Sequence, residues 1–166
     1  QLQRAVSAGH GSTLARQVNV ADVAARVSRA LEKVYVGKAV RIAIDVDPAL
    51  YFLGDERDLL EMLGNLLDNA CKYGDGEVAV SAALASATPP RMRLRIDDNG
   101  PGITVADRDR VLQRGVRLDT LAQGQGIGLA VVVDIAASYG ASVSVENSEL
   151  GGAAIVLMFD NIRVAD

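Results

Sequence analysis

Three polar side chains recur at helical spacing: Asn65, Asn69 and Lys72. An amide oxygen is a hard, neutral ligand that suits magnesium, and a lysine ammonium group can meet phosphate oxygens. Asparagine is also a poor residue for a helix interior, because its amide competes for backbone hydrogen bonds. These residues therefore predict a site for one metal–phosphate unit, although the same polar side could be only a solvated helix face.

Two glycine-rich segments could complete such a site. Residues 97–102 read Asp-Asp-Asn-Gly-Pro-Gly after a predicted strand, which places the Asp98 carboxylate at the strand end. A plain turn explains this segment equally well. Residues 124–129 read Gly-Gln-Gly-Ile-Gly-Leu and lead into a predicted helix, whose free N–H groups can bind phosphate. Leu129 stands where a dinucleotide fingerprint needs glycine, and the chain lacks the Gly-Lys-Ser or Gly-Lys-Thr of a P-loop.

The elements that must position these residues follow from hydrophobic periodicity and turn residues. Helices are expected over 20–36, 56–73 and 127–139, and strands over 40–46, 51–53, 77–84, 92–96, 142–146 and 153–159. The strands over 77–84 and 92–96 are expected to form a hairpin with Pro89 and Pro90 in its loop, and the last two strands to flank a Gly151-Gly152 turn. The polar side of the helix over 56–73 is expected to carry Asp58, Glu61, Asn65, Asp68, Asn69 and Lys72. Residues 99–125 are irregular and long for a connection, which favours a functional lid. The order of elements predicts helices packed on a sheet.

The composition fits one compact domain. The chain has 166 residues, of which 49% are hydrophobic, and a formal charge of −4 that argues against general nucleic-acid binding. The single cysteine, Cys71, cannot form an internal disulfide, and no apolar run approaches the ~20 residues that span a bilayer. A reducing, cytosolic setting is expected. Residues 1–18 are expected to be a helix end and linker before a domain at 19–166, and Gln1 in place of Met suggests a piece of a longer protein.

Three motifs in a fixed order resemble the GHKL superfamily of ATP-binding domains, specifically the sensor histidine kinases. Residues 65–73 are similar to the N box, 98–103 to the G1 box and 124–129 to the G2 box, and the resemblance covers about 20–159. Residues 68–73, the Arg114-Gly pair and residues 117–121 resemble the PhoQ magnesium-responsive subfamily. The resemblance implies a Bergerat-type two-layer α/β sandwich with a mixed sheet of about five strands on three helices.

The same resemblance implies roles for individual residues in binding ATP and Mg²⁺. Asp98 would accept a hydrogen bond from the adenine amino group, and Asn69 would bind the metal. Asn65, Lys72 and Arg117 would form the catalytic set at the phosphates. The remaining nucleotide contacts are expected from Tyr73, Gly100, Gly102, Ile103, Arg114, Gln125, Gly126, Ile127, Gly128 and Leu129, with residues 103–123 as a mobile lid.

One residue bears on the choice between kinase and ATPase chemistry. Members of the superfamily that hydrolyse ATP generally have a glutamate at the position of Asn65, and an amide cannot act as a general base. Transfer of the γ-phosphoryl group to a histidine is therefore favoured over rapid hydrolysis. A non-catalytic nucleotide-binding module is the alternative, motivated by Ala122 and Leu112, which replace an arginine and an aromatic residue of the PhoQ-like lid. An ATPase clamp is disfavoured.

The only histidine, His10, lies in Ala-Gly-His-Gly-Ser and lacks the acidic residue that follows the phosphoacceptor in this family. It is expected to be a linker residue, so this piece should not phosphorylate itself. The expected partners are a histidine-bearing dimerisation domain, whose last helix would end within residues 1–18, and a downstream response regulator. The parent is expected to be a homodimeric inner-membrane sensor, with this domain in the cytoplasm and without membrane contact of its own.

Overall fold

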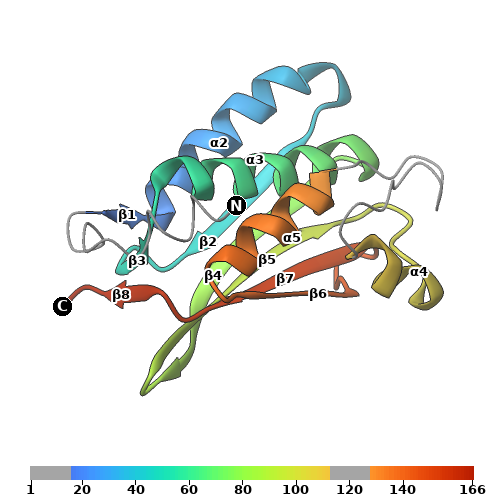
Figure 1. The fold of residues 1–166 in the computed structure, drawn as a ribbon. Coiled ribbons are helices and arrows are strands. Elements are labelled where there is room, and N and C mark those ends of the chain that lie inside the picture. Colours follow the sequence, from blue (N-terminus) through green and yellow to red (C-terminus); the bar gives the residue numbers. More distant parts are fainter. Residues whose placement is uncertain (1–15, 113–127) are drawn as a thin grey trace.

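The structure, a computed structural model, describes residues 16–112 and 128–166. Its centre is a five-stranded sheet in the order β2-β4-β5-β7-β6 (Figure 1). β2 and β4 pair in parallel, and the other neighbours are antiparallel, so the sheet is mixed as predicted. Its strands are β2 (Arg41–Val46), β4 (Glu77–Ala87), β5 (Pro90–Asp98), β6 (Ser142–Asn147) and β7 (Ala153–Phe159).

Three helices cover one face of this sheet, which confirms the predicted two-layer α/β sandwich (Figure 1). They are α2 (Val20–Val34), α3 (Glu56–Tyr73) and α5 (Gly128–Ser138). The central helix, α3, packs against both of the others. Among the described residues, none of the helices has the length and apolar content needed to cross a membrane.

A second, smaller sheet joins the two ends of the described chain. Its order is β1 (Gln17–Asn19), β3 (Leu50–Leu53) and β8 (Ile162–Val164), paired antiparallel. Only the middle strand was predicted. The other two are too short to show a hydrophobic period, and the sequence predicts residues 17 and 18 as part of the linker.

Other differences from the predicted elements are local. The helix predicted to reach residue 36 ends at Val34, because Val36–Lys38 forms a 3₁₀ turn that closes at Ala39 in the left-handed conformation (φ 56°). The segment predicted to be irregular contains a short helix, α4 (Val105–Val111), whose N-cap Thr104 accepts a hydrogen bond from the Asp107 amide. A seven-residue helix is too short for its periodicity to stand out from a loop.

The hairpin β4–β5 is longer than predicted. The sequence placed both Pro89 and Pro90 in its loop, whereas Pro90 begins β5 opposite Ala87. A register shift between Leu84 and Ser86 allows the pairing to continue. The hairpin itself and the Gly151-Gly152 turn between β6 and β7 are confirmed.

The core lies between the sheet and the three helices. Phe52 packs edge to face against Phe159 and against Tyr139, with ring centroids 5.7 and 5.0 Å apart. The Tyr139 hydroxyl donates to Asp58 Oδ2 (2.6 Å) and accepts from the Asp55 amide (3.1 Å), so it joins the end of α5 to the start of α3. Asp58 is predicted on the polar side of α3, opposite the core, whereas its carboxylate is buried against Tyr139.

Tyr139→Phe should lower the free energy of unfolding by about 1–2 kcal/mol, because the buried Asp58 carboxylate loses a hydroxyl donor. Burial and Asp58 raise the pKa of Tyr139 to about 12, so the hydroxyl is protonated at neutral pH. Urea unfolding followed by circular dichroism would measure the change. Tyr51→Phe is the matched control, because the half-buried Tyr51 ring packs under Arg163 and its hydroxyl makes no hydrogen bond within residues 16–112 and 128–166. Equal stability of the two variants would contradict the role of the Tyr139 hydroxyl.

Candidate functional site

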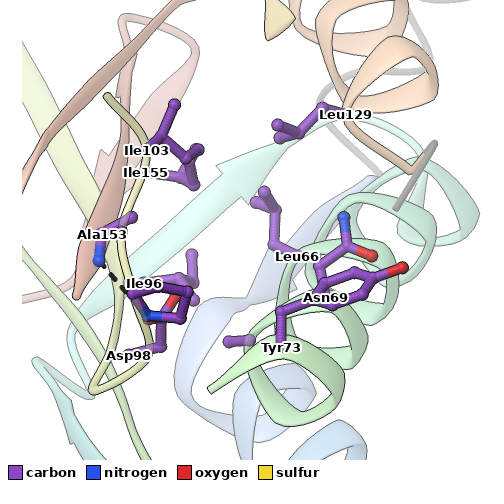
Figure 2. Close-up of a pocket in the computed structure, with 12 residues that line it drawn as sticks. Leu66, Asn69, Tyr73, Ile96, Asp98, Ile103, Leu129, Ala153 and Ile155 are labelled. Carbon is purple, nitrogen blue, oxygen red and sulfur yellow. Dashed lines mark hydrogen bonds between the residues drawn. The ribbon is translucent and has the colours of Figure 1, made fainter. Parts of the chain in front are cut away.

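A pocket opens between α3 and the adjacent ends of β5 and β7 (Figure 2). It encloses about 480 Å³ between its walls, part of which is open to solvent. Its polar side chains are Asn69, Tyr73 and Asp98, and the rest of the wall is formed by Leu66, Ala70, Ile96, Pro101, Gly102, Ile103, Leu129, Ala153 and Ile155. Apolar walls with a few fixed polar groups suit a flat ring that carries hydrogen-bond donors.

The Asp98 carboxylate is the most constrained polar group of this pocket. Its Oδ1 accepts hydrogen bonds from the backbone N–H groups of Gly100 (2.9 Å) and Ala153 (3.4 Å). Among the described residues, Oδ2 accepts none, so it is the oxygen to which a ligand can donate. Burial raises the pKa of this carboxyl, and the two backbone donors oppose that shift. The site therefore holds a partly desolvated acceptor in a fixed orientation.

The turn between β6 and β7 touches Asp98 directly. Gly152 N–H donates to the Asp98 carbonyl oxygen (3.0 Å). A Cβ atom on Gly152 would collide with Asp98 Oδ1 and would lie 2.6 Å from the Gly100 nitrogen, so only glycine fits. The sequence predicts Gly152 only as part of a hairpin turn. Its role at the site depends on a contact between segments about fifty residues apart, which a local pattern does not show.

Asn99 fixes the end of α3 against the end of β5. Its side-chain oxygen accepts hydrogen bonds from the backbone amides of Asp75 (2.7 Å) and Glu77 (3.1 Å). These two residues follow the helix, so the bonds tie the chain after α3 to the segment that carries Asp98. The two walls of the pocket are thus joined beside Asp98.

Asn69 and Tyr73 lie one turn apart on α3 and face the pocket opposite Asp98 (Figure 2). Asn65 and Lys72 share the helix but do not line the pocket. The Asn65 amide donates to the Glu61 carbonyl oxygen (2.9 Å), and the Lys72 ammonium group lies 3.9 Å from Asp68 Oδ2. The structure therefore brings together only part of the polar face that the sequence predicted as the phosphate site.

The last turn of α3 is held from outside the pocket. The Lys38 ammonium group donates to the carbonyl oxygens of Cys71 (2.9 Å) and Lys72 (2.8 Å), and the Tyr35 hydroxyl donates to Asp68 (2.6 Å). A cation at a helix C-terminus complements the helix dipole. Burial raises the pKa of the Cys71 thiol to about 11, so this cysteine is a neutral core residue and not a nucleophile.

Of the predicted site residues, Asn69, Tyr73, Asp98, Gly102, Ile103 and Leu129 line one pocket, and Gly100 and Gly128 lie beside it. Arg114, Arg117, Gln125, Gly126 and Ile127 lie outside the described residues, as do His10, Ala122 and most of the predicted lid. Leu112, at the end of α4, is half-buried and packs against the core. The apolar walls Ile96, Ala153 and Ile155 were not predicted as site residues, because they read only as strand core.

Residues 54–162 match the model of the family described as histidine kinase-, DNA gyrase B-, and HSP90-like ATPase. The chain is 40% identical over 159 residues to the virulence sensor histidine kinase PhoQ of Salmonella typhimurium and to the sensor protein PhoQ of Escherichia coli K12. The alignment covers 95% of this chain and 32% of each relative. The chain thus spans about a third of the length of these curated relatives.

Solved structures of sensor histidine kinases are also similar to this chain. The mycobacterial sensor histidine kinase MprB is 27% identical, with a TM-score of 0.73 over 86% of this chain and 95% of that one. Full-length ShkA in complex with AMPPNP is 29% identical, with a TM-score of 0.75 over 90% of this chain and 32% of that one. The chain therefore belongs to the histidine kinase-, DNA gyrase B- and HSP90-like ATPase family, and it has the fold of a sensor histidine kinase catalytic domain.

Asp98→Asn should raise the melting temperature at pH 7, because the amide retains an oxygen for Gly100 and Ala153 without the partly buried charge. The folded pKa of Asp98 is raised, so the destabilising charge develops as pH rises through that pKa and is absent at lower pH. The gain should therefore shrink as thermal unfolding is repeated toward pH 4.

Asp45→Asn is the matched control, because Asp45 is an exposed carboxylate on β2. It removes one unit of charge from the same net-acidic chain without touching the pocket. An Asp98→Asn protein that is less stable than the parent at pH 7, or whose advantage does not depend on pH, would contradict this account of the buried carboxylate.

Proposed function

We propose that this member of the sensor histidine kinase family binds Mg-ATP in the pocket between α3 and β5. The observation that carries the proposal is the half-buried Asp98 carboxylate, whose Oδ1 accepts from backbone donors and whose Oδ2 is left for a ligand. The amino group of adenine would donate a hydrogen bond to that oxygen. Ile96, Ile103 and Ile155 would pack against the faces of the base.

The phosphates would extend from the adenine pocket along α3. Asn69, one turn before Tyr73, lines the pocket with its amide, which is a suitable hard ligand for magnesium. Magnesium held by Asn69 would supply positive charge that neutralises the phosphates. Asn65 and Lys72 would turn from their contacts with Glu61 and Asp68 to reach the phosphates. Arg117, Arg114, Gln125, Gly126 and Ile127 are proposed as further contacts, together with Tyr73, Gly100, Gly102, Gly128 and Leu129.

The reaction that we propose is transfer of the γ-phosphoryl group to a histidine of a separate dimerisation domain. A neutral imidazole nitrogen would attack the γ-phosphorus, the bond to the β–γ bridging oxygen would break, and ADP would leave with that electron pair. Asn65 supports transfer over hydrolysis, since its amide cannot take a proton from an attacking water. The protein's contribution is positioning and charge neutralisation.

The wider setting is proposed from the relatives. A response regulator would receive the phosphoryl group from the histidine, and the parent would be a homodimeric inner-membrane sensor with this domain in the cytoplasm. Residues 1–18 would connect to the dimerisation domain, with Gln17 and Val18 already paired to β3 of the catalytic domain. Residues 19–166 would form that catalytic domain, with 103–123 as its lid. A nucleotide-binding module without kinase activity is the second candidate, which the replacements at Leu112 and Ala122 favour.

The test is phosphoryl transfer in trans. The chain should transfer labelled phosphate from Mg-ATP to a separately folded dimerisation domain of its own parent, whose histidine is the acceptor. The same domain with that histidine changed to alanine should remain unlabelled, and the chain alone should hydrolyse ATP slowly. Tight ATP binding without transfer would favour the regulatory module, and rapid steady-state hydrolysis would favour an ATPase clamp.

Asn69→Ala should remove the part of ATP affinity that depends on magnesium, a loss of at least tenfold, because a metal ligand at the pocket is deleted. Calorimetric titrations with and without Mg²⁺ would separate this term, and circular dichroism would show that α3 is retained. Ser144→Ala is the control, because Ser144 is an exposed residue of β6 that does not line the pocket. Equal magnesium dependence in the parent and Asn69→Ala would exclude Asn69 as the metal ligand.

A further inference from the structure

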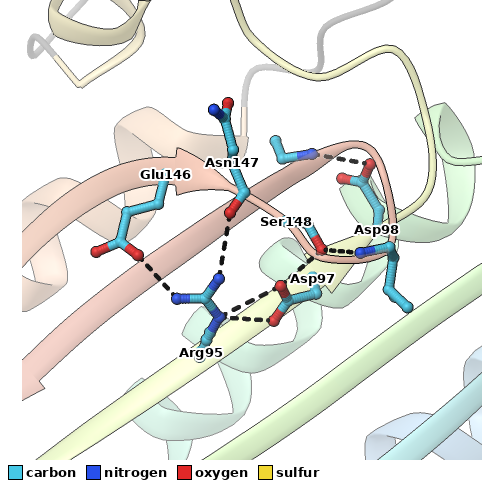
Figure 3. Close-up of polar contacts among 8 residues, drawn as sticks. Arg95, Asp97, Asp98, Glu146, Asn147 and Ser148 are labelled. Carbon is cyan, nitrogen blue, oxygen red and sulfur yellow. Dashed lines mark hydrogen bonds and ion pairs between the residues drawn. The ribbon is translucent and has the colours of Figure 1, made fainter.

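A polar cluster lies on the face of the sheet that carries none of the three packed helices (Figure 3). Arg95 is at its centre, on β5. Its guanidinium group donates to Asp97 Oδ1 (3.0 Å), to Glu146 Oε1 (2.8 Å) and to the Asn147 carbonyl oxygen (3.3 Å). The side chain is 25% exposed, so these bonds form in a partly desolvated place. These bonds link β5 to β6 across β7, the strand that lies between them.

The same cluster reaches the turn that follows β6. Ser148 Oγ donates to Asp97 Oδ2 (2.7 Å) and accepts from the Leu150 amide (3.0 Å). Asp97 and Ser148 are each only 9% exposed. The Ser148 amide also donates to the Gly152 carbonyl oxygen (2.9 Å). Asp97 is therefore a buried acceptor that holds the turn 148–152 against the end of β5.

This turn presents the backbone groups that orient Asp98. Gly152 N–H bonds the Asp98 carbonyl oxygen, and Ala153 N–H bonds its Oδ1. Asp97 thus contacts the turn on one side of the strand, while the turn contacts Asp98 on the other (Figure 3). A shift of the turn would move the Ala153 donor, and the 3.4 Å bond to Oδ1 is already long.

We infer that Asp97, held by Ser148 and Arg95, is a positioning residue that aims the Asp98 carboxylate and thereby sets the preference of the pocket for adenine. This inference rests on the proposed function. Adenine offers an amino donor where guanine offers a carbonyl oxygen, which a carboxylate repels. The discrimination depends on where Oδ2 points, so a loosened turn weakens adenine binding selectively.

A cluster that served only the stability of the sheet would behave differently. Mutations in it would change the melting temperature, and they would change the affinities for all nucleotides equally or not at all. A residue that acts through Asp98 loses its effect once Asp98 no longer accepts from adenine. A double-mutant cycle separates the two roles.

The cycle uses the parent chain, Ser148→Ala, Asp98→Asn and the double variant, titrated with ADP and GDP at fixed magnesium concentration. Ser148→Ala should weaken ADP binding about three- to tenfold, since one hydrogen bond to a buried carboxylate is lost. The same substitution should change the affinity for GDP by less than about twofold. In the Asp98→Asn background, it should also change the affinity for ADP by less than about twofold. Ser144→Ala, an exposed serine on the same face of β6, should bind ADP as the parent does.

An equal loss of ADP affinity in both backgrounds, an equal loss for GDP, or unchanged ADP binding by Ser148→Ala would overturn the inference. If Ser148→Ala fails to fold by circular dichroism, Asp97→Asn replaces it in the cycle and is judged by the same outcomes. That variant keeps an acceptor for Ser148 but weakens the pair with Arg95. A parent chain that binds no ADP would instead refute the proposed function.

Discussion

The structure depends most on one constraint, the placement of a half-buried carboxylate, Asp98, at the end of a central strand. A partly desolvated charge is unfavourable unless hydrogen-bond donors surround it. Here Gly100 and Ala153 supply backbone N–H groups, and both converge on a single oxygen of Asp98. The close approach of the two strand ends requires glycine at position 152. The fold thus accepts a local loss of stability to keep one acceptor oriented toward the pocket.

The rest of the pocket follows from how α3 is attached to that strand end. Asn99 ties the segment after the helix to the strand, and Lys38 holds the last helical carbonyl groups. At the other end of α3, Asp58 and Tyr139 join the helix to α5. Helix α3, which carries Asn69 and Tyr73, is therefore fixed at its C-terminal end to the segment beside Asp98 and at its N-terminal end to α5. A pocket with rigid walls loses little freedom when a flat ring enters it.

Long, strongly periodic elements could be predicted from the sequence. The bounds of α3 and β7 agree with the prediction, and so do the mixed sheet and the order of its main strands. β1, β8 and α4 were missed because three to seven residues do not establish a period. The polar site residues Asn69 and Asp98 could be predicted from the sequence motifs that contain them. Ser148, Gly152 and Ala153 could not, since they reach the site only through the pairing of β5 with β7.

The most direct measurement of the central claim is a two-dimensional amide NMR titration of the labelled parent chain with Mg-ATP. The account predicts that the amide signals of Gly100 and Ala153 shift strongly, because both N–H groups donate to Asp98 Oδ1. The signals of Asn69 and Tyr73 on the facing wall should shift with the same binding constant. Saturable ATP binding that leaves all four signals in place would contradict the account.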